Sequence, residues 1–415
     1  MNTTSRQVFA RFIAIDAHKH YIVLGGLNHK MEIVLPLRRI HIDRFSQWAQ
    51  QHLKPSDSVV IESTTNTWTL YDVIAPLVGQ ATVANPYQVK LIAASRVKTD
   101  KHDVWSLARL LVADMIPEVW VPPVHVRELR ALIAHRRRLS QASTRARNRL
   151  QSLLHRYNLL PPVKSPFALK HRGWWLSLDL SPAERLRMSH DLDTLAHSRE
   201  QLQSVDDELA RLTTVDAWSS SYLYLVQLPG FGLVVSMTVL AAIGDISRFP
   251  SPKHLVGYAG LGSSVHSSGL THRTGRITKQ GRKELRWVLV QAAWTAIRTN
   301  EHWKAQYQRL SKRMHPNKAI VAIARKLLVL VHHVLTNCTA DHHAHQEMVA
   351  YKLMLWSRQL GKDRREGLTT PQFVRLGLTR LGLGESLTHV TKGNTVYPIA
   401  SVEDVRQLSE PTLQN

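Results

Sequence analysis

Cysteine is nearly absent from this sequence: its 415 residues contain one, Cys338. A single thiol excludes a disulfide framework within the chain and any zinc module built on several cysteines. Because Cys338 follows the apolar stretch LLVLVHHVLTN, we expect a buried, inert thiol. No apolar run approaches the roughly 20 residues that span a bilayer, and the first residues, MNTTSRQVFARFIAID, lack the apolar segment of a secretory signal. These absences predict a cytoplasmic protein with no membrane span.

Acidic residues are scarce relative to basic ones, since 31 Asp and Glu face 54 Lys and Arg, for a net charge of +23. Such a surplus favours a polyanionic partner. Nucleic acid is the first candidate, which would place the protein at the nucleoid, and an acidic membrane surface is the rival. The hydrophobic share of 44% is ample for folded cores. A chain of this length is expected to form two or three domains.

Periodicity and proline positions divide the chain into four parts. We expect an α/β domain over 10–120, a helical connector over 121–215, a mainly helical domain over 222–338, and a tail over 339–415 whose role the sequence does not indicate. In the first part, three hairpin-like strands precede alternating helices and strands, which predicts a mixed sheet with helices on its faces. The polar end of the tail is expected to be loose.

Two acids lie at the ends of apolar strands in the first domain: Asp16 in FIAID and Glu62 in SVVIES. A carboxylate there is costly to desolvate unless it is paired or bound to a cation. Asp100 and Asp103 are three residues apart at the start of an amphipathic helix, which places both on one face. Four converging carboxylates would suit one or two Mg²⁺ ions, with Mn²⁺ as the substitute, and would support phosphodiester chemistry.

Each of these acids also fits an ordinary structural role. Asp100 could be a helix N-cap and Asp103 a first-turn acid that complements the helix dipole, while Asp16 could pair with His18 or Lys19 in a turn. For any one acid, the structural and the chemical interpretation are about even. Because the structural interpretation needs four separate coincidences, we favour the metal site.

The segments IAIDAHK around Asp16, VVIEST around Glu62 and KTDKHDVWSLA around Asp100 and Asp103 resemble the DEDD transposases of bacterial insertion sequences (the insertion sequence 110 family), also called bridge recombinases. The resemblance implies an N-terminal domain similar to the RuvC resolvase, with an RNase H-like fold, and these four acids as catalytic metal ligands. The chain departs from the family pattern after Glu62, where it lacks the usual Thr-Gly, and after Asp103, where Val104 stands in place of Ala.

The connector is expected to contain two long helices, one ending at Pro161-Pro162 and one over about 181–213. Leucines spaced by seven in the second helix indicate an a/d seam, so the helices should form an antiparallel hairpin or mediate self-association. Family members carry a coiled-coil insertion here and form oligomers, which implies a homo-oligomer, a dimer or a tetramer. Charge runs are usually solvated helix faces, but with few acids between them the arginines of the first helix favour phosphate contact. These arginines are Arg136, Arg137, Arg138, Arg145, Arg147 and Arg149.

The turn Pro229-Gly230-Phe231-Gly232 before an apolar helix resembles a helix-hairpin-helix, whose backbone N–H groups can bind a phosphate. Further along, Ser268-Gly269 and a following basic run resemble the C-terminal transposase domain of the same family. The resemblance implies that Ser268 is the nucleophile that takes the cut DNA end as a phosphoserine, with Ser267 as the alternative. From the residues alone, an ordinary Ser/Gly-rich loop is the commoner interpretation. The cations expected to contact nucleic acid and stabilise the transition state here are Arg273, Arg276, Lys279, Arg282, Lys283 and Arg286.

Histidines gather near the end of the mainly helical domain, but they lack the matching acids or cysteines of a zinc site, so we expect no specific metal there. They are His332, His333, His342, His343 and His345.

Together these features predict a transposase or site-specific recombinase of an insertion sequence, which cleaves and exchanges DNA strands with Mg²⁺ through a covalent phosphoserine. The resemblance further implies a structured guide RNA, the bridge RNA, that pairs with donor and target DNA. Two alternatives stay open: a RuvC-like endonuclease of branched DNA that uses a metal-activated water, and a non-catalytic DNA-binding protein.

Overall fold

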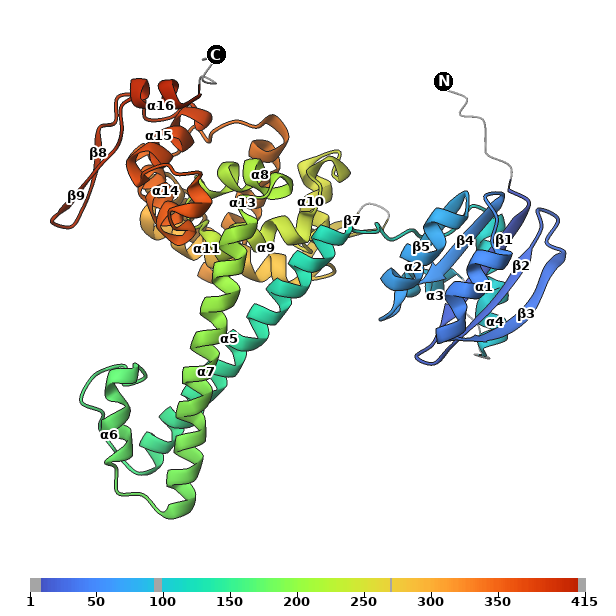
Figure 1. Cartoon of the computed structure of the whole chain (residues 1–415), viewed down its shortest axis with the longest axis horizontal. Coiled ribbons are helices and arrows are strands. Elements are labelled where there is room, and N and C mark those ends of the chain that lie inside the picture. The colour runs from blue at the N-terminus through green and yellow to red at the C-terminus, as the bar shows by residue number, and fades with distance from the viewer. Residues whose placement is uncertain (1–8, 93–98, 269–270, 410–415) are drawn as a thin grey trace, which may run out of the picture. The chain divides into compact units, whose positions relative to one another are not determined.

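The computed structural model describes residues 9–92, 99–268 and 271–409, and the chain divides into two compact units between Pro123 and Val124. The first unit contains a five-stranded sheet with the order β3-β2-β1-β4-β5 (Figure 1). β1, β2 and β3 pair antiparallel, whereas β4 is parallel to both β1 and β5. The predicted mixed sheet is therefore confirmed. The strands are β1 (Arg11–Ala17), β2 (Tyr21–Leu27), β3 (Ile33–His41), β4 (Asp57–Glu62) and β5 (Gln80–Ala84).

Helices cover both faces of this sheet because its strands are apolar on both sides. Ile13 and Ile15 of β1 pack with Phe45 in one hydrophobic cluster, and Ala14 of β1 packs with Val104 in the other. The described part of the helix expected from residue 87 ends at Ile92, and its expected continuation lies outside the described residues. The helices of the first unit are α1 (Phe45–His52), α2 (Thr67–Ile74), α3 (Pro86–Ile92) and α4 (Asp100–Val112).

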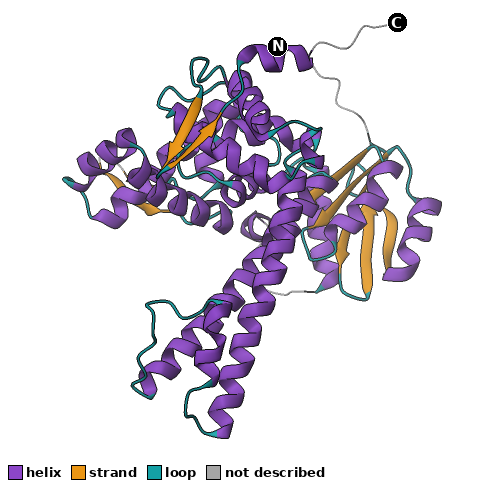
Figure 2. Cartoon of the chain, turned by 60° about the vertical axis from the view of Figure 1, so that its left-hand side comes forward, coloured by secondary structure: helices purple, strands orange, loops and turns teal. Residues whose placement is uncertain are grey.

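The second unit is mostly helical and carries two short β-hairpins (Figure 2). Its helices are α5 (Val124–Arg156), α6 (Arg172–Leu176), α7 (Pro182–Leu212), α8 (Asp216–Val226), α9 (Leu233–Ile243), α10 (Pro252–Tyr258), α11 (Lys283–Thr299), α12 (Glu301–Ser311), α13 (Pro316–Asn337), α14 (Gln346–Leu360), α15 (Thr370–Leu381) and α16 (Val402–Ser409). The hairpins are β6 (Ser263–Ser268) with β7 (Thr271–Ile277) and β8 (His389–Lys392) with β9 (Thr395–Pro398). The short 3-10 helices of the chain are η1 (Ile42–Arg44), η2 (Ala75–Leu77), η3 (Leu169–His171), η4 (Ile246–Arg248) and η5 (Asp363–Arg365).

The long helices α5 and α7 lie side by side (Figure 1). They run antiparallel, because Arg136 near the start of α5 pairs with Asp206 near the end of α7, while Arg156 at the end of α5 pairs with Glu184 at the start of α7. Leu195, Val205 and Leu209 of the predicted a/d seam are buried, and Leu202 and Leu212 are half-buried. Of the two arrangements considered for these helices, the structure shows the antiparallel pair.

Two expectations about the apolar stretch that ends near Cys338 are wrong: that no apolar segment is long enough to span a bilayer, and that Cys338 is buried. Helix α13 is long and apolar enough, by length and composition alone, to cross a membrane. It packs against α10 and α11, and its buried residues, such as Leu327 and Leu328, place it within the core of the second unit. Cys338 is exposed rather than buried, because the helix ends there and the residue takes the left-handed conformation of a helix C-cap.

The tail after residue 338 packs onto the same unit through α14 and α15, which contact α8. The Trp356 indole donates a hydrogen bond to Thr213 Oγ1 at 2.7 Å, and the Lys352 ammonium donates to the carbonyl oxygens of Val226 and Leu228. Most of the tail is therefore folded. Its last six residues, 410–415, were expected to be loose and lie outside the described residues.

Candidate functional site

Asp16 and Glu62 lie at the same level of two neighbouring parallel strands. Ile15 of β1 pairs with Ile61 of β4, so the next residue of each strand is an acid. Side chains alternate between the two faces of a strand. Since Ile15 and Ile61 belong to the cluster beneath α1, both acids are directed to the opposite face, which α4 covers.

Helix α4 brings Asp100 and Asp103 to that same face. Its N-cap is Thr99, whose hydroxyl accepts a hydrogen bond from the backbone N–H of His102, and both aspartates lie in the first turn. The buried side of α4 packs against β1 and β2, and this contact holds the first turn near the sheet. Asp100 is therefore not the N-cap.

His18, in the turn between β1 and β2, lies between two of the carboxylates. Its Nε2 is 3.2 Å from Asp16 Oδ2 and 3.4 Å from Asp100 Oδ2. This nitrogen is buried, yet neither contact has the geometry of a hydrogen bond. Tyr21 donates a hydrogen bond to Asp100 Oδ2 at 3.2 Å, and its ring stacks against the guanidinium of Arg39. The pairing of Asp16 with His18 is one of the structural alternatives considered from sequence.

The structure brings together some of the predicted metal ligands more closely than others. Asp16, His18 and Asp100 each offer a ligand atom within 4.8 Å of the others, and they are the one such group found among the described residues. Asp103 lies near enough to act electrostatically on Asp16. Glu62 shares the face but is outside that group.

Burial raises the pKa of Asp16, and the negative charges of Asp100 and Asp103 raise it further, while His18 opposes the shift. The side chain of Asp16 is only 11% exposed. Ionised Asp16 is therefore unfavourable unless a cation compensates for it.

The donor set suits a divalent metal. Carboxylate oxygens are preferred by Mg²⁺ and Mn²⁺, and an imidazole nitrogen is better tolerated by Mn²⁺ and later transition ions. The raised pKa of Asp16, and the gathering of Asp16 and Asp100 oxygens within 3.4 Å of His18 Nε2, both indicate a place where a cation would be stabilising. These residues therefore fit a metal, although the set differs from four carboxylates by including His18.

The loop after Glu62 is built by hydroxyl and amide side chains. Thr67 Oγ1, which is buried, contacts the carbonyl of Glu62 at 3.1 Å and accepts a hydrogen bond from the backbone N–H of Thr64 at 2.6 Å. The side-chain amide of Asn66 donates to the carbonyl of His18 at 3.4 Å. These contacts hold the loop against the His18 turn where the family pattern has a glycine.

Ser268 lies in the second unit as the last residue of β6, at the end of a hairpin rather than in an irregular loop. It is exposed, and it pairs in register with Thr271 of β7. Ser267 precedes it and therefore points to the opposite face of the hairpin. Gly269 of the predicted Ser-Gly pair lies outside the described residues.

The cations that follow Ser268 divide into two groups. Arg273, Arg276, Lys279 and Lys283 are exposed. Arg282 instead donates to the hydroxyl of Tyr258 at 3.0 Å, and Arg286 donates to the carbonyl of Ala259 at 2.9 Å. These two hold the end of α10 against α11.

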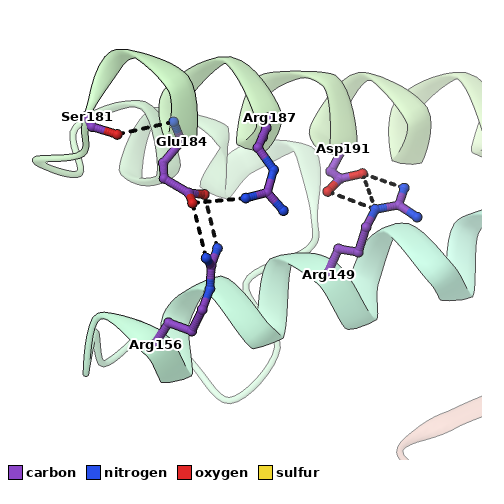
Figure 3. A network of polar contacts seen from close by, with 6 residues as sticks. All are labelled: Arg149, Arg156, Ser181, Glu184, Arg187 and Asp191. Atoms are coloured by element: carbon purple, nitrogen blue, oxygen red, sulfur yellow. Dashed lines mark hydrogen bonds and ion pairs between the residues drawn. The ribbon is translucent and has the colours of Figure 1, made fainter.

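Several arginines of α5 are paired with acids from other helices. Arg149 contacts Asp191, and Arg156 contacts Glu184, which also accepts from Arg187 (Figure 3). Ser181 caps the start of α7 in the same network. Arg136 pairs with Asp206, and Arg137 pairs with Glu284 of α11. These arginines were expected to contact phosphate because few acids lie near them in the sequence. In the fold, Arg136, Arg137 and Arg149 are each paired with an acid from another helix.

The turn at Gly230 is fixed by packing. Gly230 has φ +82°, and a Cβ there would lie 2.3 Å from the carbonyl oxygen of Ala292 in α11. Phe231 is fully buried, and its backbone N–H is bonded to the carbonyl of Leu228. A close approach to α11 therefore explains this glycine without a ligand.

The first unit thus places an acidic cluster fit for a divalent metal on a mixed α/β sheet, and a mostly helical region follows it. Two family models match the chain: the transposase model of DEDD proteins of the IS110 type over residues 13–159, and that of the transposase IS116/IS110/IS902 family over residues 223–308. The chain belongs to this family of DNA transposases.

Relatives in several bacteria carry names of the same kind. The putative transposase y4qE of Sinorhizobium fredii is 30% identical over 54% of this chain and 55% of its own length. The pilin gene-inverting protein of Moraxella bovis is 30% identical over 72% of this chain and 87% of its own. The transposase for insertion sequence element IS1111A of Coxiella burnetii is 25% identical over 61% of this chain and 70% of its own.

His18 is the site residue that the sequence reasoning did not select. It appeared only as a turn partner of Asp16, since a histidine in a short turn carries no periodic signal. Its position two residues after an acid at a strand end was the available clue.

Proposed function

We propose that this chain cuts and rejoins DNA as the transposase or site-specific recombinase of an insertion sequence, acting in the cytoplasm on nucleoid DNA. The observation that carries the proposal is the group formed by Asp16 of β1, His18 of the following turn and Asp100 of the first turn of α4, in a domain that matches DEDD transposases. The name of the Moraxella bovis relative, a protein that inverts a gene, supports recombination rather than cleavage alone.

The strand order supports an RNase H-like, RuvC-like fold for the first unit. Three antiparallel strands followed by two parallel ones, in the order β3-β2-β1-β4-β5, place β1 at the centre beside β4. That arrangement directs the acids of both central strands to one face.

Asp16, Glu62, Asp100 and Asp103 are proposed to hold Mg²⁺, or Mn²⁺ in its place, with His18 as a further donor. When bound, the metal would activate the attacking oxygen and stabilise the charge on the leaving oxygen. Before it binds, Tyr21 orients Asp100 through a hydrogen bond, and the Asn66 contact holds the His18 turn.

Ser268 is proposed to supply the nucleophile. Its Oγ forms a bond to phosphorus as the phosphodiester P–O bond breaks, and the hydroxyl proton ends on the released DNA oxygen. Attack by the incoming DNA hydroxyl on the phosphoserine reverses this exchange and joins the strands. The exposed Arg273, Arg276, Lys279 and Lys283 would offset charge on the phosphorane.

We further propose that the chain acts as a homo-oligomer, a dimer or tetramer, with the α5–α7 pair as its coiled-coil element. The guide for target choice is proposed to be a structured bridge RNA that pairs with donor and target DNA. The charge of +23 supports both nucleic-acid partners.

The test is a search for the covalent intermediate with end-labelled DNA of the element, guide RNA and Mg²⁺. Wild type is expected to give a protein–DNA adduct that survives SDS, and peptide mass spectrometry should place the phosphate on Ser268. Ser268→Ala should abolish the adduct, while Ser263→Ala, at the other end of β6, and Ser267→Ala should retain it.

Cleavage that persists in Ser268→Ala would favour the RuvC-like endonuclease with a metal-activated water. DNA binding in wild type with no cleavage under Mg²⁺ or Mn²⁺, and unchanged behaviour of Asp16→Ala and Asp103→Ala, would favour a non-catalytic DNA-binding protein.

A further inference from the structure

A groove of about 450 Å³ lies in the second unit where α5, α9 and α11 meet. Helix α9 packs against both of the other helices. The lining residues of α5 recur at intervals of three and four from Ile133 to Arg145, so one face of this helix borders the groove over about three turns. Helix α11 contributes Glu284 and Trp287 to the opposite side.

Trp287 leaves 58% of its surface exposed at this groove. Burial of a tryptophan side chain is strongly stabilising, so an indole ring left open on a helix is available to a partner. Ile133, which is buried, and Val234, which is half-buried, also line the groove. An exposed indole ring above apolar side chains suits a flat ring that stacks on it.

The charged residues that line the groove are three arginines and one glutamate: Arg136, Arg137, Arg145 and Glu284. Arg136 is paired with Asp206, and Arg137 Nη1 lies 2.5 Å from Glu284 Oε1. Arg145 is exposed and forms no ion pair with another described residue. This excess of positive charge beside an open aromatic ring favours an anionic ligand.

The pair of Arg137 with Glu284 leaves room for a phosphate. Both side chains are partly exposed, at 43% and 38%, so the pair contributes little to stability. Its hydrogen bond comes from Nη1, whereas a guanidinium carries five N–H donors. The exposed Ser140, Gln141 and Thr144 lie between Arg137 and Arg145 on the same face of α5. Side chains of these types are common phosphate contacts in nucleic-acid complexes.

A second copy of the chain is a poorer occupant of this groove. Symmetric dimers bring the same face of two protomers together. The arginines of the groove would then approach their own counterparts, and like charges facing each other across an interface are unfavourable. A nucleic acid instead supplies phosphates for the cations and flat bases for the indole ring.

We propose that this groove binds an unpaired stretch of nucleic acid, with one base stacked on Trp287 and backbone phosphates at Arg137 and Arg145. The proposal rests on the proposed function only in assuming a nucleic-acid partner, and it adds that the strand is unpaired here. Bases within a duplex stack on one another, whereas an unpaired base has an open face for an aromatic ring. Because every base has such a face, the groove selects unpaired strands rather than a sequence.

The test measures binding of the full-length protein to short labelled probes by fluorescence anisotropy. The probes are a thymine DNA strand, a uracil RNA strand, a DNA strand with abasic residues in place of the thymines, and a DNA duplex. Trp287→Ala should weaken binding of the thymine or the uracil strand by about 5- to 150-fold, the effect of one lost base stack. Binding of the abasic strand and of the duplex should be nearly unchanged.

Two variants serve as controls. Trp287→Phe retains an aromatic ring and should keep most of the affinity for the unpaired strand. Leu355→Ala removes an exposed apolar side chain of α14, outside the groove, and should leave the binding of every probe unchanged. Because Trp287 is exposed, Trp287→Ala should melt near the wild-type temperature. Photocrosslinks from strands that carry 5-iodouracil should map to α11 at Trp287.

The phosphate contacts are tested through the dependence of binding on salt. Arg145→Gln should reduce the slope of the logarithm of the binding constant for the thymine strand against the logarithm of salt concentration by about 0.7. Glu284→Gln removes the one negative charge among the lining residues and should tighten binding of that strand. This gain should fade as salt is added, because salt screens the repulsion between the carboxylate and the phosphates.

Equal affinity of wild type and Trp287→Ala for both the thymine and the uracil strand would overturn the proposal, as would an equal loss on the abasic strand or the duplex. A change of oligomeric state in Trp287→Ala without a loss of strand binding would assign the groove to a second copy and would also refute it. The assay requires no cleavage, so a failed search for the phosphoserine leaves this result intact. An active recombinase whose strand binding does not depend on Trp287 refutes the groove proposal alone.

Discussion

Replacing Asp16 with Asn should make the metal-free protein more stable than wild type. When a divalent metal is added, the variant should instead be the less stable of the two. Asp16 is buried and lies within 4.8 Å of a carboxylate oxygen of Asp100. Two unit charges at this distance repel by about 1 kcal/mol in water and roughly 3.5 kcal/mol at an effective dielectric constant near 20. Because the Asp100 side chain is 44% exposed, screening favours the lower part of that range.

The direction of the pKa shift gives the pH window. Since the folded-state pKa of Asp16 is raised above its unfolded value of 3.8, the ionised carboxylate lowers stability once the pH exceeds both values. In EDTA, Asp16→Asn should therefore be about 1–2 kcal/mol more stable than wild type at pH 7. This gap should shrink as the pH falls through the raised pKa of Asp16, because the carboxyl becomes protonated there.

Metal reverses the order of stability. A metal at 100 times its dissociation constant stabilises wild type by about 2.7 kcal/mol, and Asp16→Asn should lose most of this gain. Calorimetric and denaturant unfolding in EDTA, Mg²⁺ and Mn²⁺ would measure the effect, with the exposed Asp43→Asn as the control. An Asp16→Asn protein that is less stable than wild type in EDTA, or that gains equally from metal, would refute the reasoning.

Three further predictions concern the second unit. Gly230→Ala should lower the free energy of unfolding by roughly 2–4 kcal/mol, because φ is +82° and the new Cβ would meet α11. Gly232→Ala, where a Cβ would meet open space, should lower it little, and equal losses in the two variants would contradict the packing. Burial lowers the pKa of Lys352 from 10.5 to about 7, so between these pH values the unfolded chain binds more protons than the folded one. The free energy of unfolding of wild type should therefore rise by up to about 1.4 kcal/mol per pH unit relative to Lys352→Met. Parallel stability–pH curves for the two proteins would argue against this shift. Arg147→Gln should reduce the slope of the logarithm of the DNA-binding constant against the logarithm of salt concentration by about 0.9. Arg149→Gln, which breaks the ion pair with Asp191, should mainly lower stability. An unchanged slope for Arg147→Gln would show that Arg147 contacts no phosphate.

The sheet and its acids could be predicted because the relevant signals are local. Apolar runs that end in Asp16 and Glu62 identify strands, and strand alternation then determines the face on which each acid lies. The spacing of Asp100 and Asp103 likewise predicted that both acids lie on one face in the first turn of a helix, as they do in α4. The role of His18 was not, because it depends on how closely the α4 turn approaches the β1–β2 turn.

The remaining features depend on contacts between distant segments. Strand β6, which ends at Ser268, consists largely of small polar residues that carry no strand periodicity, so the sequence indicated a loop. One pocket of the second unit is lined by both Trp303 and Asp341, which are 38 residues apart in the chain, and no spacing rule relates them. The C-cap conformation of Cys338 exposes a thiol that its apolar neighbours suggested was buried.

Charge on α5 shows why composition alone does not assign a role to an arginine. The antiparallel register of α7 places Asp206 and Asp191 beside Arg136 and Arg149, so these two cations are offset within the fold. Exposed ion pairs contribute only about 0.2–1 kcal/mol each, and a phosphate could compete for the exposed guanidinium of Arg149, whereas the Arg136–Asp206 pair is half-buried. Among the described residues, Arg145 and Arg147 form none of these ion pairs and are exposed. Binding a phosphate there displaces no carboxylate, so the salt-dependent part of nucleic-acid binding by α5 should come chiefly from these unpaired positions.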